Sequence, residues 1–158
     1  MGVGTDGVIE WSVVEATELD VPTLYGLLVL RSAVFVVEQE CAYQDPDGRD
    51  LVPGTRHVLG RRGDELVAYA RVLPATGEKP PRIGRVIVSE AARGQRLARQ
   101  LMDLALQTCE ESWPGSGVEL GAQAHLTDFY GSLGFVPVGA PYDEDGIPHQ
   151  WMRREPRG

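Results

Sequence analysis

The chain is poor in several residue types, and each shortage argues against a class of protein. It has only two cysteines among 158 residues, Cys41 and Cys109, too few for a disulfide framework. We therefore expect reduced thiols in a cytoplasmic protein. It carries 15 lysines and arginines against 23 aspartates and glutamates, a net charge of −8. It thus lacks the basic surface that broad nucleic-acid binding needs.

Long apolar runs are also missing. No uninterrupted apolar stretch reaches the roughly 18 residues that a membrane helix needs, so we expect no membrane partner. The first ten residues, MGVGTDGVIE, have neither the basic segment nor the apolar centre of a signal peptide. Hydrophobic residues make up 42% and charged residues 24% of the chain, as in a single globular domain. We expect one domain over 1–158, with a flexible N-terminus at 1–7.

Periodicity predicts an α/β fold. Helical spacing covers 21–37, a segment beginning at Leu97 that ends before Trp113, and 127–133. Asp20 and Pro22 are typical of the start of the first helix. Strands are predicted at 8–15, 56–61, 65–73, 82–88, 118–122, 135–138 and 147–153.

One strand-to-helix junction indicates an anion site. The β-branched run at 86–88 is followed by a loop with Gly94 and then by the second predicted helix. The first amides of a helix have no partner within it, and its dipole favours negative charge there. A diphosphate group fits such a site.

Two motifs carry a resemblance to a known family. Arg93 through Ala98 resembles motif A of the GNAT (general N-acetyltransferase) superfamily, Q/R-x-x-G-x-G/A, with Arg96 in place of the central glycine. Downstream, Phe129–Phe135 resembles the F-Y-x-x-x-G-F of motif B. Longer phrases are similar to the ElaA branch, which also carries a basic residue at the central motif A position; they are LRSAVFVVEQ, GRVIVSEAARG, GAQAHLTDFY and EDGIPHQWM. The resemblance extends from about Trp11 to Arg154.

The resemblance implies a fold and a co-substrate. The fold is a mixed central sheet of about six to seven strands flanked by about four helices, with splayed central parallel strands. The co-substrate is acetyl-CoA or another acyl-CoA, whose diphosphate and pantetheine arm would contact the loop, the helix start and the strand before them. The implied cofactor-binding residues are Val86, Ile87, Val88, Arg93, Gly94, Gln95, Arg96, Leu97, Ala98 and Arg99.

The resemblance also assigns the chemistry. A backbone N–H near Val88 would stabilise the oxyanion that forms on the thioester carbonyl. Tyr130 matches the tyrosine that protonates the departing coenzyme A, and packing against the core is its alternative role. The reaction is direct attack by a neutral amine in a ternary complex.

The general base is open from the sequence. His149 and Glu38 are the leading candidates, because both are expected near a carboxylate-rich acceptor pocket where segments 38–53 and 145–149 meet. His57, His125 and Glu40 are alternatives. The histidines do not fall at a metal-site spacing, so no metal is expected.

Other features are given weaker roles. Cys41 is expected to be a passive thiol, and Asp45, Asp47 and Asp50 a solvated loop that lines the acceptor pocket. Together with Arg31, Phe35, Glu38 and Arg71, that loop also resembles acyl-homoserine-lactone synthases, which share the GNAT fold.

The function predicted from the sequence is N-acyl transfer, most simply of acetyl, to a primary amine of a small molecule or protein. The alternatives are a non-catalytic acyl-CoA sensor and an acyl-homoserine-lactone-synthase-like enzyme. The acceptor's identity, the acyl chain and the oligomeric state, with a homodimer possible, are not fixed by the sequence.

Overall fold

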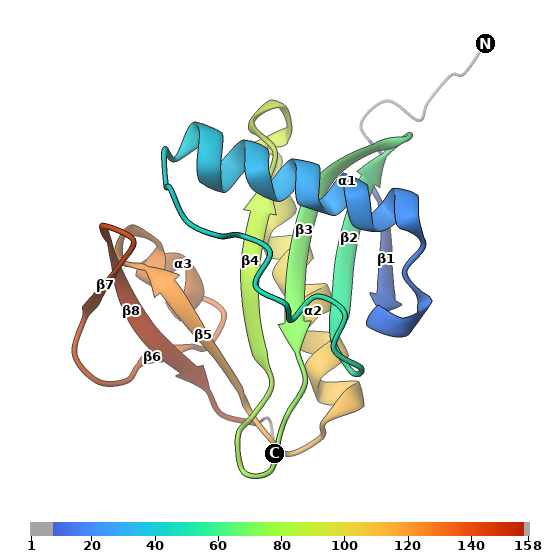
Figure 1. The fold of residues 1–158 in the computed structure, drawn as a ribbon. Helices are drawn as coiled ribbons and strands as arrows, with labels where there is room; N and C mark the ends of the chain where they lie inside the picture. The colour runs from blue at the N-terminus through green and yellow to red at the C-terminus, as the bar shows by residue number, and fades with distance from the viewer. Residues whose placement is uncertain (1–7, 157–158) are drawn as a thin grey trace.

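A computed structural model describes residues 8–156, and the expected flexible segment 1–7 lies outside them. Eight strands in this part of the chain form one mixed sheet with the order β1-β2-β3-β4-β5-β8-β6, and β7 pairs with β8 (Figure 1). The strands are β1 (Glu10–Glu15), β2 (Arg56–Arg62), β3 (Glu65–Leu73), β4 (Arg82–Val88), β5 (Val118–Gln123), β6 (Val136–Pro137), β7 (Tyr142–Glu144) and β8 (Ile147–Arg154).

Helices cover both faces of the sheet. Helix α1 (Val21–Arg31) lies across one face of β2–β4, and α2 (Leu97–Ser112) lies on the opposite face (Figure 1). The short α3 (Thr127–Gly131) follows β5. Side chains of β3 are buried on both faces of the sheet, which is why a helix packs on each face. Tyr69 packs with Leu27 of α1, whereas Val72 packs in the cluster that contains Leu101 of α2.

Helix α1 begins as its sequence predicts and continues in an altered form. Asp20 caps it by accepting a hydrogen bond from the Thr23 amide at 2.8 Å. Beyond Arg31 the chain continues as a π-helical segment, Ser32–Glu38. Although Arg31 interrupts its apolar run, Val21–Glu38 is long and apolar enough to cross a membrane by length and composition alone, with a mean hydropathy of 1.6. Length and composition are weak grounds, and Arg31 within this stretch is fully buried in ion pairs.

The two central parallel strands separate almost at once, as the family resemblance implies. Strands β4 and β5 share a single register pair, Arg82 with Glu119, and then diverge (Figure 1). Within β4, Arg85 has a φ of 52° and interrupts the register with β3 between Tyr69 and Arg71. The bulge and the separation leave one edge of β4 unpaired along most of its length.

The fold class and most element bounds match the prediction. The sheet has one more strand than the upper expected number, because Tyr142–Glu144 forms β7 against Ile147–His149 of β8. This strand has only three residues, all exposed, and therefore shows no apolar alternation in the sequence.

Candidate active site between the splayed strands

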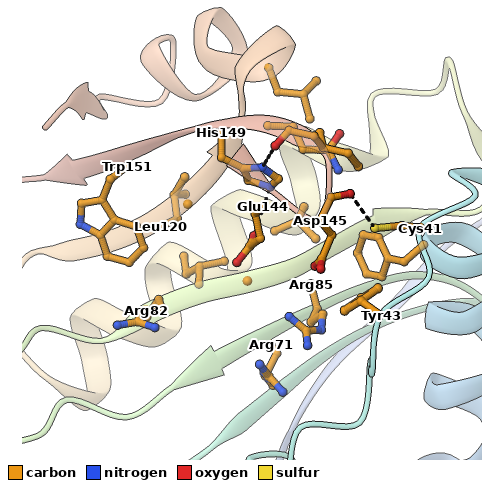
Figure 2. Close-up of a pocket in the computed structure, with 18 of the residues that line it drawn as sticks. Cys41, Tyr43, Arg71, Arg82, Arg85, Leu120, Glu144, Asp145, His149 and Trp151 are labelled. Carbon is orange, nitrogen blue, oxygen red and sulfur yellow. Dashed lines mark hydrogen bonds and ion pairs between the residues drawn. The ribbon is translucent and has the colours of Figure 1, made fainter. Parts of the chain in front are cut away.

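A cavity of about 400 Å³ lies where β4 and β5 separate (Figure 2). On the α1 face of the sheet it is lined by Arg71 of β3, His149 of β8 and the segment around Tyr43. On the other side it reaches Tyr130 of α3 and Val86 of β4. The cavity therefore passes through the opening in the sheet and connects its two faces.

Two glycines shape this cavity. A Cβ added to Gly84 would meet nothing within 4 Å, so the missing side chain leaves open space on the floor of the cavity. A Cβ added to Gly121 would lie 2.6 Å from the Tyr142 hydroxyl, so the absence of a side chain there lets the Tyr142 ring lie close against β5. Neither role could be inferred from the residues around these glycines.

A buried ionic network holds one wall of the cavity. Arg31 donates to Asp45 at 2.8 Å and to Asp50 at 2.5 Å, and Arg71 donates to Asp50 at 3.0 Å and bidentately to Asp47 at 2.8 Å. The expectation of a solvated loop is wrong for Asp45 and Asp50, which are buried. An α1 arginine and a β3 arginine therefore fix the segment between α1 and β2 against the sheet.

The network also sets protonation states. Burial raises the pKa of Asp50, but hydrogen bonds and charges from Arg31 and Arg71 outweigh it and hold that pKa below its ordinary value. Asp47 is lowered likewise, because Arg71 overcomes the effect of burial on its pKa. Both carboxylates therefore stay ionised, and fully paired, at neutral pH.

The three histidines have different surroundings. His57 is fully buried outside the cavity, between the Tyr69 hydroxyl at 2.6 Å and the Asp50 carbonyl at 2.8 Å, and burial lowers its pKa. His125 is exposed and does not line the cavity. His149 is the histidine of the three that lines it.

His149 is held in a fixed orientation. Its Nδ1 lies 2.8 Å from the Ile147 carbonyl oxygen, which can only accept, so Nδ1 carries a hydrogen. Its Nε2 lies 3.3 Å from Glu144 (Figure 2). Its ring also stacks on that of Tyr142. Nε2 is therefore the ring nitrogen that is left to accept a hydrogen.

Glu38 was a candidate general base at the acceptor pocket, but it lies outside the cavity. It is not among the residues lining the cavity and instead forms a bidentate ion pair with Arg93, with one contact of 2.9 Å. The hydrogen bonds from Arg93 lower the pKa of Glu38. Arg93 also donates through Nε to the Val88 carbonyl at 3.1 Å. Glu38 thus fixes the first arginine of the phosphate-site motif against the end of β4.

Tyr130 closes the far side of the opening. It is buried on α3, packed edge-on against Phe129 and Phe135, and it lines the cavity. Burial raises the pKa of Tyr130 to about 12. Its phenol therefore keeps its proton throughout the physiological range.

The start of α2 exposes a row of amides. Gly94 and Arg96 adopt left-handed conformations, with φ of 83° and 60°, and Arg96 caps the helix without a side-chain hydrogen bond. Among residues 8–156, the first amide near this start with a backbone acceptor is that of Gln100, 3.4 Å from the Arg96 oxygen. Within the described residues the amides of 94–99 thus have no backbone acceptor, and Arg93, Arg96 and Arg99 belong to the same segment, a combination that suits an anion such as a diphosphate.

The backbone at the end of β4 faces the opening. The Ser89 amide donates toward β3, to the Val67 carbonyl at 2.8 Å. Because successive peptide groups of a strand point to opposite sides, the N–H of Val88 points toward β5 and into the gap. The side chain of Ile87 packs under α1, whereas Val86 and Val88 pack on the α2 side.

The charge of the cavity differs from the prediction. Four arginines line it (Arg49, Arg71, Arg82 and Arg85), against three carboxylates (Asp47, Glu144 and Asp145), so the pocket is not carboxylate-rich. The predicted meeting of the two segments does occur, since the Cys41 thiol approaches the Asp145 carbonyl at 3.6 Å (Figure 2). The alternation of side chains along a strand could have predicted from the sequence that Arg82 and Gly84 share one face of β4, and that His149 and Trp151 share one face of β8. Among residues 8–156, no group of three or more His, Cys, Asp or Glu could hold a metal ion.

Comparisons with known proteins agree with this geometry. The pattern of the acetyltransferase (GNAT) domain matches residues 33–156. Protein ElaA of Escherichia coli is 57% identical over 149 residues, which are 94% of this chain and 97% of that protein. The crystal structure of Escherichia coli ElaA superposes with a TM-score of 0.90 at 56% identity, over 94% of this chain and 100% of that one.

Two further solved structures are similar. An acyl-CoA N-acyltransferase from Pseudomonas aeruginosa is 49% identical with a TM-score of 0.90, over 93% of this chain and 99% of that one. An aminoglycoside 6′-N-acetyltransferase complexed with coenzyme A is 18% identical with a TM-score of 0.69, over 93% and 99% of the two chains, and shares the fold alone. Because the domain pattern matches most of its length and a relative is 57% identical to it, the chain belongs to the GNAT acetyltransferase family, in its ElaA-like branch.

Proposed function

We propose that this protein transfers an acetyl group from acetyl-CoA to a primary amine within one ternary complex. The observation that carries the proposal is the opening between β4 and β5, where one cavity joins Tyr130 on one face of the sheet to His149 on the other. A donor and an acceptor can therefore meet there from opposite faces. When bound, acetyl-CoA would supply the thioester.

The chain's own groups are suited to hold that donor. The free amides of 94–99 and the side chains of Arg96 and Arg99 would bind the diphosphate. Arg93, already paired with Glu38 and with the Val88 carbonyl, would hold the loop in place instead of reaching the diphosphate. The unpaired edge of β4 would pair with the pantetheine arm as an added strand does.

Three groups would act on the reacting atoms. The Val88 N–H, which faces the gap, would stabilise the oxyanion. Tyr130, protonated at neutral pH, would donate its proton to the thiolate that leaves. Nε2 of His149, beside Glu144, would accept the proton of the attacking amine directly or through one water. Most of the acceleration would come from orientation and fixed dipoles.

Thermal melting with coenzyme A or acetyl-CoA, combined with thiol release across a panel of amines, tests this proposal. A ligand at a hundred times its dissociation constant adds about 2.7 kcal/mol to the free energy of unfolding, which raises the Tm by several degrees. A rise in Tm together with amine-dependent thiol release is expected. A rise without release from any amine would identify an acyl-CoA sensor, and no rise at saturating ligand would refute the donor site.

A further inference from the structure

The acceptor side of the cavity contains a guanidinium group without an ionic partner. Arg82 lines the cavity, and within residues 8–156 no carboxylate lies within 4.0 Å of it. Glu119, its register partner on β5, is taken by Arg153 at 3.2 Å. Arg82 stacks instead on the ring of Trp151, 4.9 Å from its centroid. Stacking uses the face of the guanidinium and leaves its N–H groups free at the edge.

Among the described residues, none of the three carboxylates that line the cavity, Asp47, Glu144 and Asp145, forms an ion pair with Arg82. Asp47 is paired with both Arg71 and Arg85, and Glu144 faces His149. Arg71 is almost fully buried, and its Nε–H has no acceptor among the described residues. Two arginines of the cavity thus have donors to spare.

These donors surround the open space above Gly84. On the face of the sheet shared with α1, Arg71 is the register partner of Gly84, and Arg82 precedes it by two residues on β4. Because a side chain at Gly84 would fill this space and none is there, a ligand group can enter between the two arginines. A carboxylate matches a guanidinium edge in geometry and charge.

The same space lies within reach of the proposed base. The Arg82 guanidinium stacks on Trp151, which lies two residues from His149 on the same face of β8, about 7 Å along the strand. In an α-amino acid the amine and carboxylate are separated by about 3 Å. With a hydrogen bond of about 3 Å at each end, such a molecule spans about 9 Å, which exceeds the rise between His149 and Trp151, the residue on which Arg82 stacks. A cavity of about 400 Å³ also suits a molecule of that size.

We propose that the acceptor is an amine that carries a carboxylate, of the size of a single amino acid, with its carboxylate bound over Gly84 by Arg82 and Arg71. This inference rests on the proposed N-acyltransferase activity and narrows its substrate class. A polyamine or an aminoglycoside is expected to be a poor acceptor, because neither has an anionic group that these arginines could bind.

Matched pairs of amines test the proposal, each pair being an amino acid and its decarboxylated form: lysine and cadaverine, histidine and histamine, phenylalanine and phenethylamine, tyrosine and tyramine. Thiol release from acetyl-CoA is measured for the native protein, Arg82→Met and Arg82→Lys. Charge-assisted hydrogen bonds of this kind correspond to a roughly 10- to 100-fold preference in kcat/KM for the carboxylate-bearing member. Arg82→Met should remove most of that preference through KM, and Arg82→Lys should restore part of it.

Two controls separate this role from a structural one. Arg62→Met removes an arginine that does not line the cavity and should change neither member of any pair. Gly84→Val fills the space between the arginines, where its added atoms have room, and should abolish amino-acid turnover while leaving coenzyme A affinity unchanged. Equal turnover of both members of every pair, a preference for the decarboxylated members, or an equal loss for both in Arg82→Met would overturn the proposal.

Binding measurements distinguish this failure from failure of the proposed activity. Calorimetry with coenzyme A present compares the N-acetyl amino acids with the N-acetyl derivatives of the decarboxylated amines. If no amine releases thiol, yet an N-acetyl amino acid binds and Arg82→Met weakens it roughly 10- to 100-fold, the carboxylate site stands and the transferase activity fails. If no N-acetyl amino acid binds and none of the amino acids reacts, the carboxylate site is refuted.

Discussion

Replacing Arg31 by methionine should destabilise the protein strongly. Arg31 is fully buried and makes three polar contacts, two with Asp45 and one with Asp50. Arg85 also pairs with Asp45 at 2.9 Å, so the three arginines of the network (Arg31, Arg71 and Arg85) balance its three aspartates in charge. The substitution therefore leaves one buried negative charge without compensation. Removing one partner of a buried ion pair costs about 3–5 kcal/mol. For a domain of this length that lowers the Tm by roughly 6–20 °C.

The stability that the ionic network contributes should depend on pH. The pKa values of Asp47 and Asp50 are lowered in the folded state, so the unfolded chain binds more protons as the pH falls toward the ordinary carboxyl range. Their contribution to stability is therefore present above about pH 4 to 5 and is lost as the pH drops below it. The cost of Arg31→Met should shrink in the same window.

Urea unfolding followed by circular dichroism, from neutral pH down to about pH 3.5, measures both effects. Arg62→Met is the matched control and should cost less than about 0.5 kcal/mol. A cost below about 1 kcal/mol for Arg31→Met at neutral pH, or one that does not change with pH, would refute the reasoning. In the surviving folded fraction, the KM of the amine should rise more than that of acetyl-CoA, because the wall that the network holds faces the acceptor.

Three other variants probe the proposed chemistry. Tyr130→Phe keeps the packing and removes the proton donor, so turnover should fall by about 10²–10⁴-fold. The loss should be uniform from about pH 6 to pH 9, because the phenol stays protonated there. A loss that varies across this range would assign Tyr130 another role. Ala98→Glu should abolish coenzyme A binding in calorimetry by placing a carboxylate beside the free amides, whereas Ala33→Glu, an equal charge at an exposed position, should not. His149→Ala should lower the turnover of the amine while leaving coenzyme A affinity unchanged, because it removes only the group proposed to accept the amine proton; unchanged turnover would contradict that assignment.

The fold was predictable because its long elements carry strong patterns. Strand β4 was predicted at its observed bounds, and helix α2 at its start, since a buried strand and an amphipathic helix have clear apolar periods. The π-helical segment after Arg31 and the strand β7 were missed. The first keeps a helical pattern of apolar residues, and the second is short and fully exposed.

The site was predictable where a motif fixes the backbone, and less so where side chains meet across the fold. The helix-start loop follows from local sequence, because Gly94 and the helix after it determine the exposed amides. The pairing of Glu38 with Arg93 joins residues 55 positions apart, and nothing in the spacing indicates it. The loop aspartates illustrate the same limit, since their burial depends on arginines contributed by α1 and β3.

The single residue pair between β4 and β5 divides the hydrogen bonding of the sheet into two parts, which share one hydrophobic core. The part from β1 to β4, with α2, contains the loop and helix start that would bind the donor, whereas β5, β7 and β8 would form much of the acceptor wall. All three residues of β7 are exposed, so substitutions there disturb no core packing. A lineage could therefore alter the acceptor through the β7–β8 hairpin while retaining its donor site, and relatives should differ most in that hairpin where their acceptors differ.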